Sequence, residues 1–423
     1  MQNFWNKVKI VFTDKSLRNR IIFVIVALAI FRLLAAVPLP GIDKLRLEQF
    51  LSNNQFLGVL NIFSGGGLSN LSIVMLGVGP YITSSIIMQL LTIMVPKLKA
   101  LYHEEGEAGK KKFTQYSRML TIPLAVVQGF GLMVLLTQQG ILGDLTIFQK
   151  VVNLSVIVGG SMLIMWIGEL ISEFGISNGV SLLIFAGIVS AIPSSISQLI
   201  FTFDPSQLSL FITFILAGLV IIVGVVMVSE AERPIPVTYA KQVRGLKTYG
   251  GKSTYLPLRI NQAGVIPIIF ALSILLFPQM IGNFLAGSAN SVLHAISVFM
   301  LAFSQNTWIY SISYFVLVFL FTYFYTAVTF DPDALATNLQ KNGAFIPGIR
   351  PGEATSAYIS KILNRITLVG AVFLGLIAVL PLVMKAVTGI TAIALGGTAL
   401  LIVVSVVIDL IKKVDAQISM REY

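Results

Sequence analysis

Residues 61–95 read NIFSGGGLSNLSIVMLGVGPYITSSIIMQLLTIMV. The first third of this stretch is small or polar, and each of its three consecutive glycines weakens a helix by about 1 kcal/mol relative to alanine. Residues 73–95 are apolar and long enough to cross a bilayer. Irregular backbone at membrane depth is tolerated only where it is buried in protein or lines a cavity. The stretch therefore predicts a broken half-span beside a pore or a binding site in the membrane.

The glycine-rich part has two simpler interpretations, which the residues alone leave open. It could be a re-entrant loop that only fills space, or a long extracellular loop.

The composition of the chain indicates that it lies in a membrane. Of the 423 residues, 56% are hydrophobic and 11% are charged, which is typical of a polytopic membrane protein. The chain has no cysteine, so disulfides, iron–sulfur clusters and thiolate zinc sites are excluded.

Apolar segments of sufficient length recur along the chain and predict an all-α membrane protein with ten transmembrane helices. The predicted spans are residues 20–37, 73–95, 117–137, 152–171, 179–200, 209–229, 264–285, 308–329, 364–385 and 389–409. Of the 29 Lys and Arg residues, 24 lie on the side of the two termini and of the loops after spans two, six and eight. The other five are Lys44, Arg46, Lys150 and Lys385 on the opposite side and Arg32 within span one. The positive-inside rule then places both termini in the cytosol.

Five predicted spans precede Asp204 and five follow it. An odd number of spans in each half reverses the orientation of the second half. We therefore expect two inverted five-helix halves, 20–203 and 204–409, around a central pore. A cytosolic amphipathic N-terminus (1–19) and a cytosolic tail (410–423) flank them.

Two long cytosolic loops, 230–262 and 330–363, are expected to differ from simple linkers. Alternating apolar positions such as Ile235 and Val237 favour an extended arm in the first loop. Glycines and prolines around Arg350 favour a rigid tip in the second loop. Such a tip is typical of a docking site, although a purely structural turn stays open.

Catalysis is not expected, because the spans contain almost no ionisable groups. Arg32 is the one such residue well inside a span, whereas Glu169, Glu230 and Asp409 sit near span ends. Intramembrane proteases and ion-coupled transporters need ionisable or nucleophilic groups within the bilayer. We expect no metal and no cofactor. A polypeptide conduit fits best, with an inverted-repeat secondary transporter of small solutes as the alternative and a membrane enzyme third.

Six motifs, in order along the chain, resemble the SecY/Sec61-alpha family of protein-translocation channels. They are SGGGLSNLSIVMLGVGPYITSSIIMQLL, FGISNGVSLLIFAGI, ERPIPVTYAK, LPLRINQAGVIP, NGAFIPGIRPGEAT and GGTALLIVV. The resemblance covers essentially the whole chain. It implies a pore closed by a short plug helix, with a lateral gate between spans two and seven, assisted by three and eight. The implied function is passage of unfolded secretory polypeptides across the bacterial plasma membrane, with lateral release of hydrophobic signal or transmembrane segments into lipid.

The resemblance also implies roles for individual residues. A pore ring would comprise Ile82, Ile86, Ile184, Ile188, Ile269 and Ile402, which the sequence alone would read as ordinary core or lipid-facing residues. The plug, about 59–72, would include Ser64, Gly65, Gly66, Gly67, Leu68, Ser69 and Asn70. Cytosolic docking would involve Arg233, Lys241, Arg244, Lys247 and Arg350, although Gln242 and Leu246 depart from the basic residues of many relatives. The implied partners are SecE-type and SecG-type small membrane subunits, a SecA motor ATPase, the ribosome, signal-sequence-bearing precursors and membrane lipids.

Overall fold

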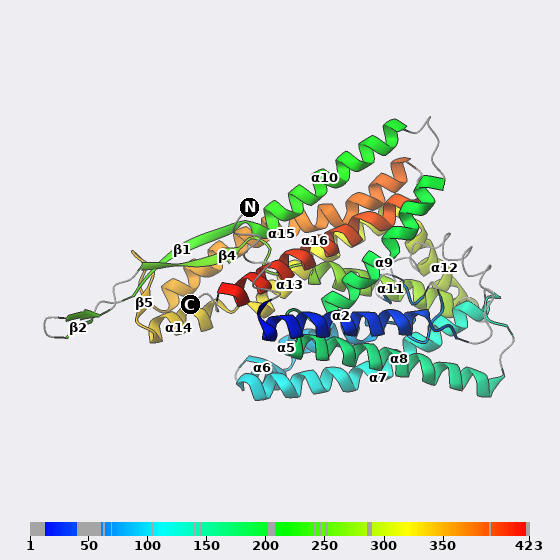
Figure 1. The fold of residues 1–423 in the computed structure, drawn as a ribbon, viewed down its shortest axis with the longest axis horizontal. Helices are drawn as coiled ribbons and strands as arrows, with labels where there is room; N and C mark the ends of the chain where they lie inside the picture. Colours follow the sequence, from blue (N-terminus) through cyan, green and yellow to red (C-terminus); the bar gives the residue numbers. More distant parts are fainter. Residues whose placement is uncertain are drawn as a thin grey trace.

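The computed structural model describes residues 13–39, 61, 64–68, 70–103, 105–138, 140–143, 146–201, 208–239, 242–244, 247–249, 253–285, 290–388 and 391–419. The chain is a bundle of long helices with a small sheet that projects from one end, here called the sheet end (Figure 1). The helices are α2 (Lys15–Ala36), α5 (Gly79–Met94), α6 (Pro96–His103), α7 (Gly106–Gln138), α8 (Ile147–Phe174), α9 (Gly179–Phe201), α10 (Leu208–Glu230), α11 (Ile266–Leu285), α12 (Ser291–Gln305), α13 (Thr307–Thr329), α14 (Pro332–Lys341), α15 (Glu353–Thr388) and α16 (Thr391–Ser419). The strands are β1 (Glu232–Tyr239), β2 (Gln242–Arg244), β3 (Lys247–Tyr249), β4 (Ser253–Arg259) and β5 (Ala344–Phe345).

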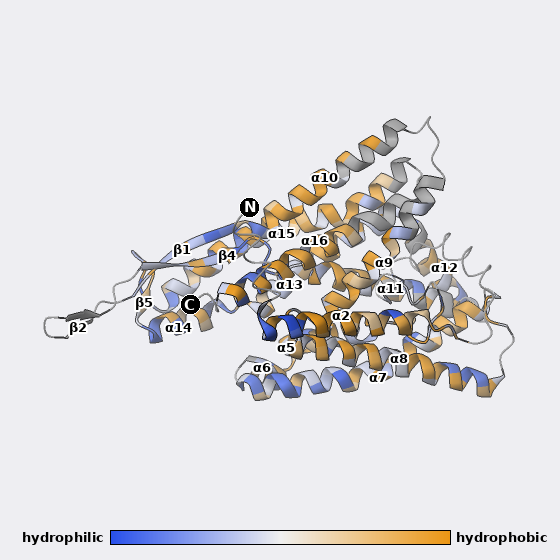
Figure 2. Cartoon of the chain, viewed as in Figure 1, coloured by the Kyte–Doolittle hydropathy of each residue, from blue (hydrophilic) through white to orange (hydrophobic). Residues whose placement is uncertain are grey.

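Each of the ten predicted spans overlaps one helix: α2, α5, α7, α8, α9, α10, α11, α13, α15 or α16. Within the described part of the chain, α2, α7, α8, α13 and α15 are long and apolar enough to cross a membrane. The pair α5 and α6, bent by 114°, passes the same test together. The bundle is mostly hydrophobic, while the elements at the sheet end carry hydrophilic stretches (Figure 2). The predicted all-α membrane class is thereby confirmed, and the count of ten spans stays a prediction that these helices fit.

Several helices extend beyond the predicted spans, because hydropathy marks the lipid layer and not the helix end. The helix predicted from residue 20 begins at Lys15, where the Asp14 carboxylate accepts hydrogen bonds from the backbone N–H groups of Ser16 (2.7 Å) and Leu17 (3.1 Å). Such a cap stabilises a helix by about 1 kcal/mol. At the other terminus α16 continues to Ser419, so most of the predicted tail is helix. The rest of the predicted N-terminal segment, residues 1–12, lies outside the described residues.

Span two is not one continuous helix, contrary to the prediction. α5 begins only at Gly79, and turns occupy most of residues 70–78. The backbone of Leu71 has φ 39°, a left-handed value that interrupts a helix. The expected plug helix is also absent from the described part of residues 59–72 beyond residue 61: residues 64–68 and 70–71 form turns. Ser69 lies outside the described residues.

The link from α11 to α13 is not a simple loop. α11 begins at Ile266, so Pro267 falls in the first turn of the helix, where its missing N–H group costs nothing. The proline inside this helix is Pro278. The loop predicted to follow contains a further helix, α12, which packs on α11. The Ser297 hydroxyl of α12 donates to the carbonyl of Gly282 at 2.7 Å.

The predicted extended arm of loop 230–262 is confirmed. β1 pairs antiparallel with β4 along its length and with β5 at its end, so the loops 230–262 and 330–363 share one sheet. Ile235 and Val237 are buried beneath this sheet together with Ile346, Ile359 and other apolar residues. The cluster unites β1, β4, β5 and the start of α15 into one module at the sheet end.

Candidate pore, plug and docking surface

All six isoleucines predicted to form a pore ring are buried, with exposed fractions of 1% to 7%. They belong to one continuous apolar cluster. Ile82 and Ile86 come from α5, Ile184 and Ile188 from α9, Ile269 from α11 and Ile402 from α16. The fold therefore brings together residues from both halves of the sequence. Many other apolar residues share the cluster, so burial alone does not single out a ring, and the ring role stays a prediction.

The glycine-rich plug turn is built around Ser64, which is fully buried. Its hydroxyl donates to the carbonyl of Asn61 at 3.0 Å and accepts from the backbone N–H of Leu68 at 3.0 Å. Leu68 is itself buried in a second apolar cluster, among residues of α7 and α8. The side chains of this turn thus fix a compact loop inside the protein and not an extracellular one.

The tip of the plug turn is wedged between α2 and α9. Gly65 has φ 65°, and a Cβ atom built on it would lie 2.0 Å from the Phe31 ring of α2. A Cβ atom built on Gly187 of α9 would lie 2.3 Å from the Cα atom of Gly65. Neither position leaves room for a side chain, so two glycines permit the contact. Gly187 directly precedes Ile188, which places the plug tip beside the predicted ring.

The end of the plug region is tied to its surroundings by backbone hydrogen bonds. The N–H of Leu39 donates to the carbonyl of Leu71 at 2.9 Å, and the N–H of Ile73 donates to the carbonyl of Val37 at 3.1 Å. Further along, the Ser161 hydroxyl of α8 donates to the carbonyl of Gly77 at 3.0 Å. These bonds satisfy backbone groups that a broken span would otherwise leave unpaired in lipid.

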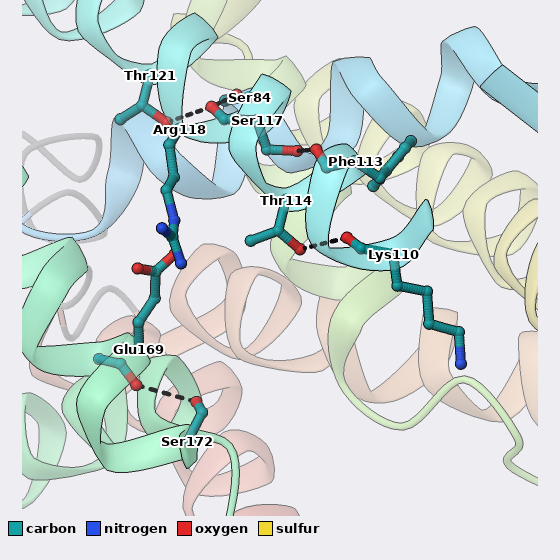
Figure 3. Close-up of polar contacts among 10 residues, drawn as sticks. Ser84, Lys110, Phe113, Thr114, Ser117, Arg118, Thr121, Glu169 and Ser172 are labelled. Carbon is teal, nitrogen blue, oxygen red and sulfur yellow. Dashed lines mark hydrogen bonds and ion pairs between the residues drawn. The ribbon is translucent and has the colours of Figure 1, made fainter. Parts of the chain in front are cut away.

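The helices α5, α7 and α8 are joined by polar contacts near the sheet end (Figure 3). The Ser84 hydroxyl of α5 donates to the carbonyl of Ser117 in α7 at 2.5 Å. The Arg118 guanidinium of α7 pairs with the Glu169 carboxylate of α8 at 2.6 Å. These bonds hold the three helices as one wall.

The seam between α5 and α11 is different. The two helices contact each other, and α7 also contacts α11. The hydrogen bonds and ion pairs found among the described residues include none between α5 and α11. Ile82 of α5 and Ile269 of α11 are both buried and belong to the same apolar cluster. An apolar seam has no directional bonds to break, which suits a joint that opens toward lipid.

A polar cavity of about 260 Å³ lies toward the sheet end. The residues that line it come from the start of α9, the end of α10, the link from β4 to α11, α13 and α16. They include Asn178, Asn261, Gln262 and Asp409. At its edge, the Asp409 carboxylate accepts from the Ser177 hydroxyl at 2.8 Å and pairs with Lys413 at 2.8 Å. These contacts join the α8–α9 turn of the first half to α16 of the second.

Of the five predicted docking residues, Arg233 and Arg350 are exposed on the sheet-end module. The Thr355 hydroxyl, on a side chain only 2% exposed, donates to the carbonyl of Arg350 at 2.9 Å and fixes the tip. Arg244 and Lys247 pair in register at the end of the β2–β3 hairpin. Lys241 lies outside the described residues.

Sequence reasoning missed the residues that surround the tip of the plug turn. Arg32 was noticeable as an ionisable residue within a span, but nothing in the sequence indicated its partner. Phe31 and Gly187 had no signal beyond ordinary membrane-helix composition. Thr355 could have been found by its place five residues after Arg350 within one motif.

Comparison with known proteins agrees with this geometry. The family described as SecY matches residues 72–411. Proteins named protein translocase subunit SecY are similar over nearly the whole chain: that of Mycobacterium leprae is 42% identical, with 96% of each chain covered, and that of Synechocystis is 42% identical, with 96% of this chain and 93% of the relative covered. The solved structure of a protein-conducting channel shares the fold, with a TM-score of 0.61, 17% identity and coverage of 93% of this chain and 90% of that one. The yeast Ssh1 complex bound to the 80S ribosome gives a TM-score of 0.65, 15% identity and coverage of 93% and 89%.

Proposed function

The chain belongs to the SecY family, and on that premise we propose that it forms a channel for unfolded polypeptides through a bacterial plasma membrane. The observation that carries the proposal is the plug tip wedged between α2 and α9 beside buried isoleucines from both halves. A narrow constriction of branched aliphatic side chains repels water and offers no ligand to ions. Such a constriction lets a chain of any sequence pass without strong binding, and it seals when idle.

The proposed path runs from the sheet end toward the opposite end of the bundle. A polypeptide enters through the polar cavity, where amide and hydroxyl groups can exchange hydrogen bonds with an extended backbone. It then passes between α5, α9, α11 and α16 at the level of the proposed ring. The plug turn must leave its seat between Phe31 and Gly187 before the chain can pass.

The same pore is proposed to open sideways between α5 and α11. An apolar segment that reaches this seam can partition into lipid, which favours each central apolar residue by about 0.3–0.6 kcal/mol. The apolar character of the seam supports this route. The polar contacts among α5, α7 and α8 support movement of these helices as one wall.

The proposed orientation puts the sheet end and both termini in the cytosol, as the charge distribution predicts. There the module carrying Arg233 and Arg350 would dock a SecA-type motor or a ribosome. Two relatives in fold are described as ribosome-bound channels, one canine and one yeast. SecE-type and SecG-type subunits would complete the complex in the membrane. We expect no enzymatic step in this chain, so energy for transport comes from the docked partner or the membrane potential.

A proteoliposome assay tests the proposal. The chain is reconstituted with its small subunits, a motor ATPase and ATP, and protection of a secretory precursor from external protease is measured. Protection that needs both the motor and an intact signal sequence is the expected result. Precursor that stays fully digestible would contradict the proposal, and uptake of a small solute in its place would favour the transporter alternative.

A further inference from the structure

Arg32 of α2 makes a direct bond to the plug turn. Its Nη1 atom donates to the carbonyl oxygen of Gly65 at 2.6 Å. The side chain is exposed and sits four residues before the end of α2, in the half of the helix away from the sheet end. Hydrogen bonds from a charged donor are roughly twice as strong as those between neutral groups. An arginine close to lipid also gains from each polar partner that it keeps.

The geometry around Gly66 shows that this bond belongs to a built seat. A Cβ atom on Gly66 would lie 3.3 Å from Nη1 of Arg32 and 3.8 Å from the Ser190 hydroxyl. Arg32 of α2 and Ser190 of α9 therefore flank the turn with polar groups. Phe31 and Gly187, one from each of the same helices, enclose its tip. Two residues of α2 and two of α9 therefore surround two consecutive plug residues, and Arg32 bonds directly to one of them.

We propose that Arg32 is the residue that holds the plug closed. Its guanidinium binds the Gly65 carbonyl and retains the turn against Phe31 and Gly187. The inference rests on the proposed function, since it assumes that the turn must leave its seat for the channel to open. The bond exists only in the seated state, so its removal shifts the equilibrium toward the open state. Arg32 thereby raises the binding free energy that a signal sequence must supply to open the channel.

The test measures plug position without reference to transport. Ser190→Cys provides the only cysteine of the chain, because the natural sequence has none. The chain is assembled with its small subunits in proteoliposomes, and the rate at which a membrane-impermeant maleimide labels this cysteine is measured. Arg32→Gln and Arg32→Lys are compared with Arg20→Gln, which removes an exposed arginine from the sheet end of the same helix.

We expect Arg32→Gln to label about ten times faster than the parent, a factor that corresponds to about 1.4 kcal/mol. Arg32→Lys keeps the charge, so its labelling rate should lie between those of the parent and Arg32→Gln. The labelling rate of Arg20→Gln should equal that of the parent. Equal labelling rates for Arg32→Gln and Arg20→Gln would overturn the proposal. If Arg32→Gln fails to assemble, the labelling rate of Arg32→Lys is compared with that of Arg20→Gln, and equal rates would overturn the proposal.

Precursor transport is measured on the same vesicles to separate the two proposals. If the parent transports no precursor, the proposed function fails, while the labelling rates still report whether Arg32 holds the turn. If the parent transports precursor and Arg32→Gln labels no faster, the function stands and the role of Arg32 is wrong.

Discussion

At the scale of single residues, the proposed closure depends on the close approach of two glycines, Gly65 and Gly187. Gly187→Ala would place a Cβ atom 2.3 Å from the Cα atom of Gly65, so the plug turn must move. Overpacking of this kind costs about 1–3 kcal/mol, which corresponds to roughly 5- to 150-fold in an equilibrium. We expect a matching rise in the ion current through the idle channel, measured in a planar bilayer.

Gly159→Ala on α8 is the matched control for this variant, because a Cβ atom at that position would meet nothing within 4 Å. It should leave the current unchanged. If the ion current through the idle Gly187→Ala channel is as low as that through the Gly159→Ala channel, the plug turn does not seal at α9.

Thr355 is a second residue with a sharp expectation. Thr355→Val keeps the shape but removes the hydroxyl that donates to the carbonyl of Arg350. Loss of a buried hydrogen bond costs about 1–3 kcal/mol, so the tip that carries Arg350 should loosen. We expect motor-driven precursor transport to fall several-fold in the reconstituted system. Thr114→Val, which removes a similar hydroxyl-to-carbonyl bond on an exposed face of α7, should transport normally. Equal transport rates for the two variants would show that the Thr355 hydroxyl does not support docking.

Burial in the central apolar cluster could be predicted for residues that belong to a motif, whereas the contacts around the plug tip could not. All six proposed ring isoleucines proved buried in one cluster. The residues that enclose the plug tip could not be predicted, because Phe31 and Gly187 look like any other membrane-helix residues. Their meeting depends on the approach of α2 and α9, which no local pattern encodes.

At the scale of elements, α12 exposes an apolar face that calls for an apolar environment. Val292, Val298 and Phe299 are 64%, 53% and 75% exposed, while Ser297 faces α11. At 15 residues the helix is too short to cross a bilayer. We expect it to lie in the outer part of the lipid layer. A nitroxide on Phe299→Cys should then relax faster with oxygen than with a water-soluble nickel complex.

The control for this measurement is a nitroxide on Ser253→Cys, at the exposed start of β4 on the sheet-end module, which should favour the nickel complex. Matching behaviour of positions 299 and 253 would mean that water covers α12.

Helix positions were predictable from hydropathy, and helix ends were not. The apolar run from residue 73 to 95 contains a break, because Gly77 adopts left-handed backbone with φ 52°, which does not alter the hydropathy. α2 starts early because Asp14 caps it. α12 escaped prediction because a 15-residue apolar helix between two spans resembles a loop with apolar residues.

At the scale of the whole molecule, the proposed pore depends on both halves. The apolar cluster takes α5 and α9 from one half and α11 and α16 from the other. Odd span counts in each half predicted this arrangement in outline. The shared sheet of β1, β4 and β5 joins two loops of the second half, which the sequence did not indicate. The contact between Ser177 and the Asp409–Lys413 pair joins the two halves to each other.

The most direct measurement places a polypeptide inside this pore. Ile269→Cys is introduced into the cysteine-free chain, a secretory precursor with a single cysteine is stalled during transport, and disulfide formation between them is measured. Val220→Cys on α10, which is 71% exposed, is the matched control outside the pore. We expect a crosslink at position 269 that needs the motor and the signal sequence, and none at 220. No crosslink at 269 with the precursor engaged, or equal crosslinking at both positions, would contradict a path through the isoleucine ring.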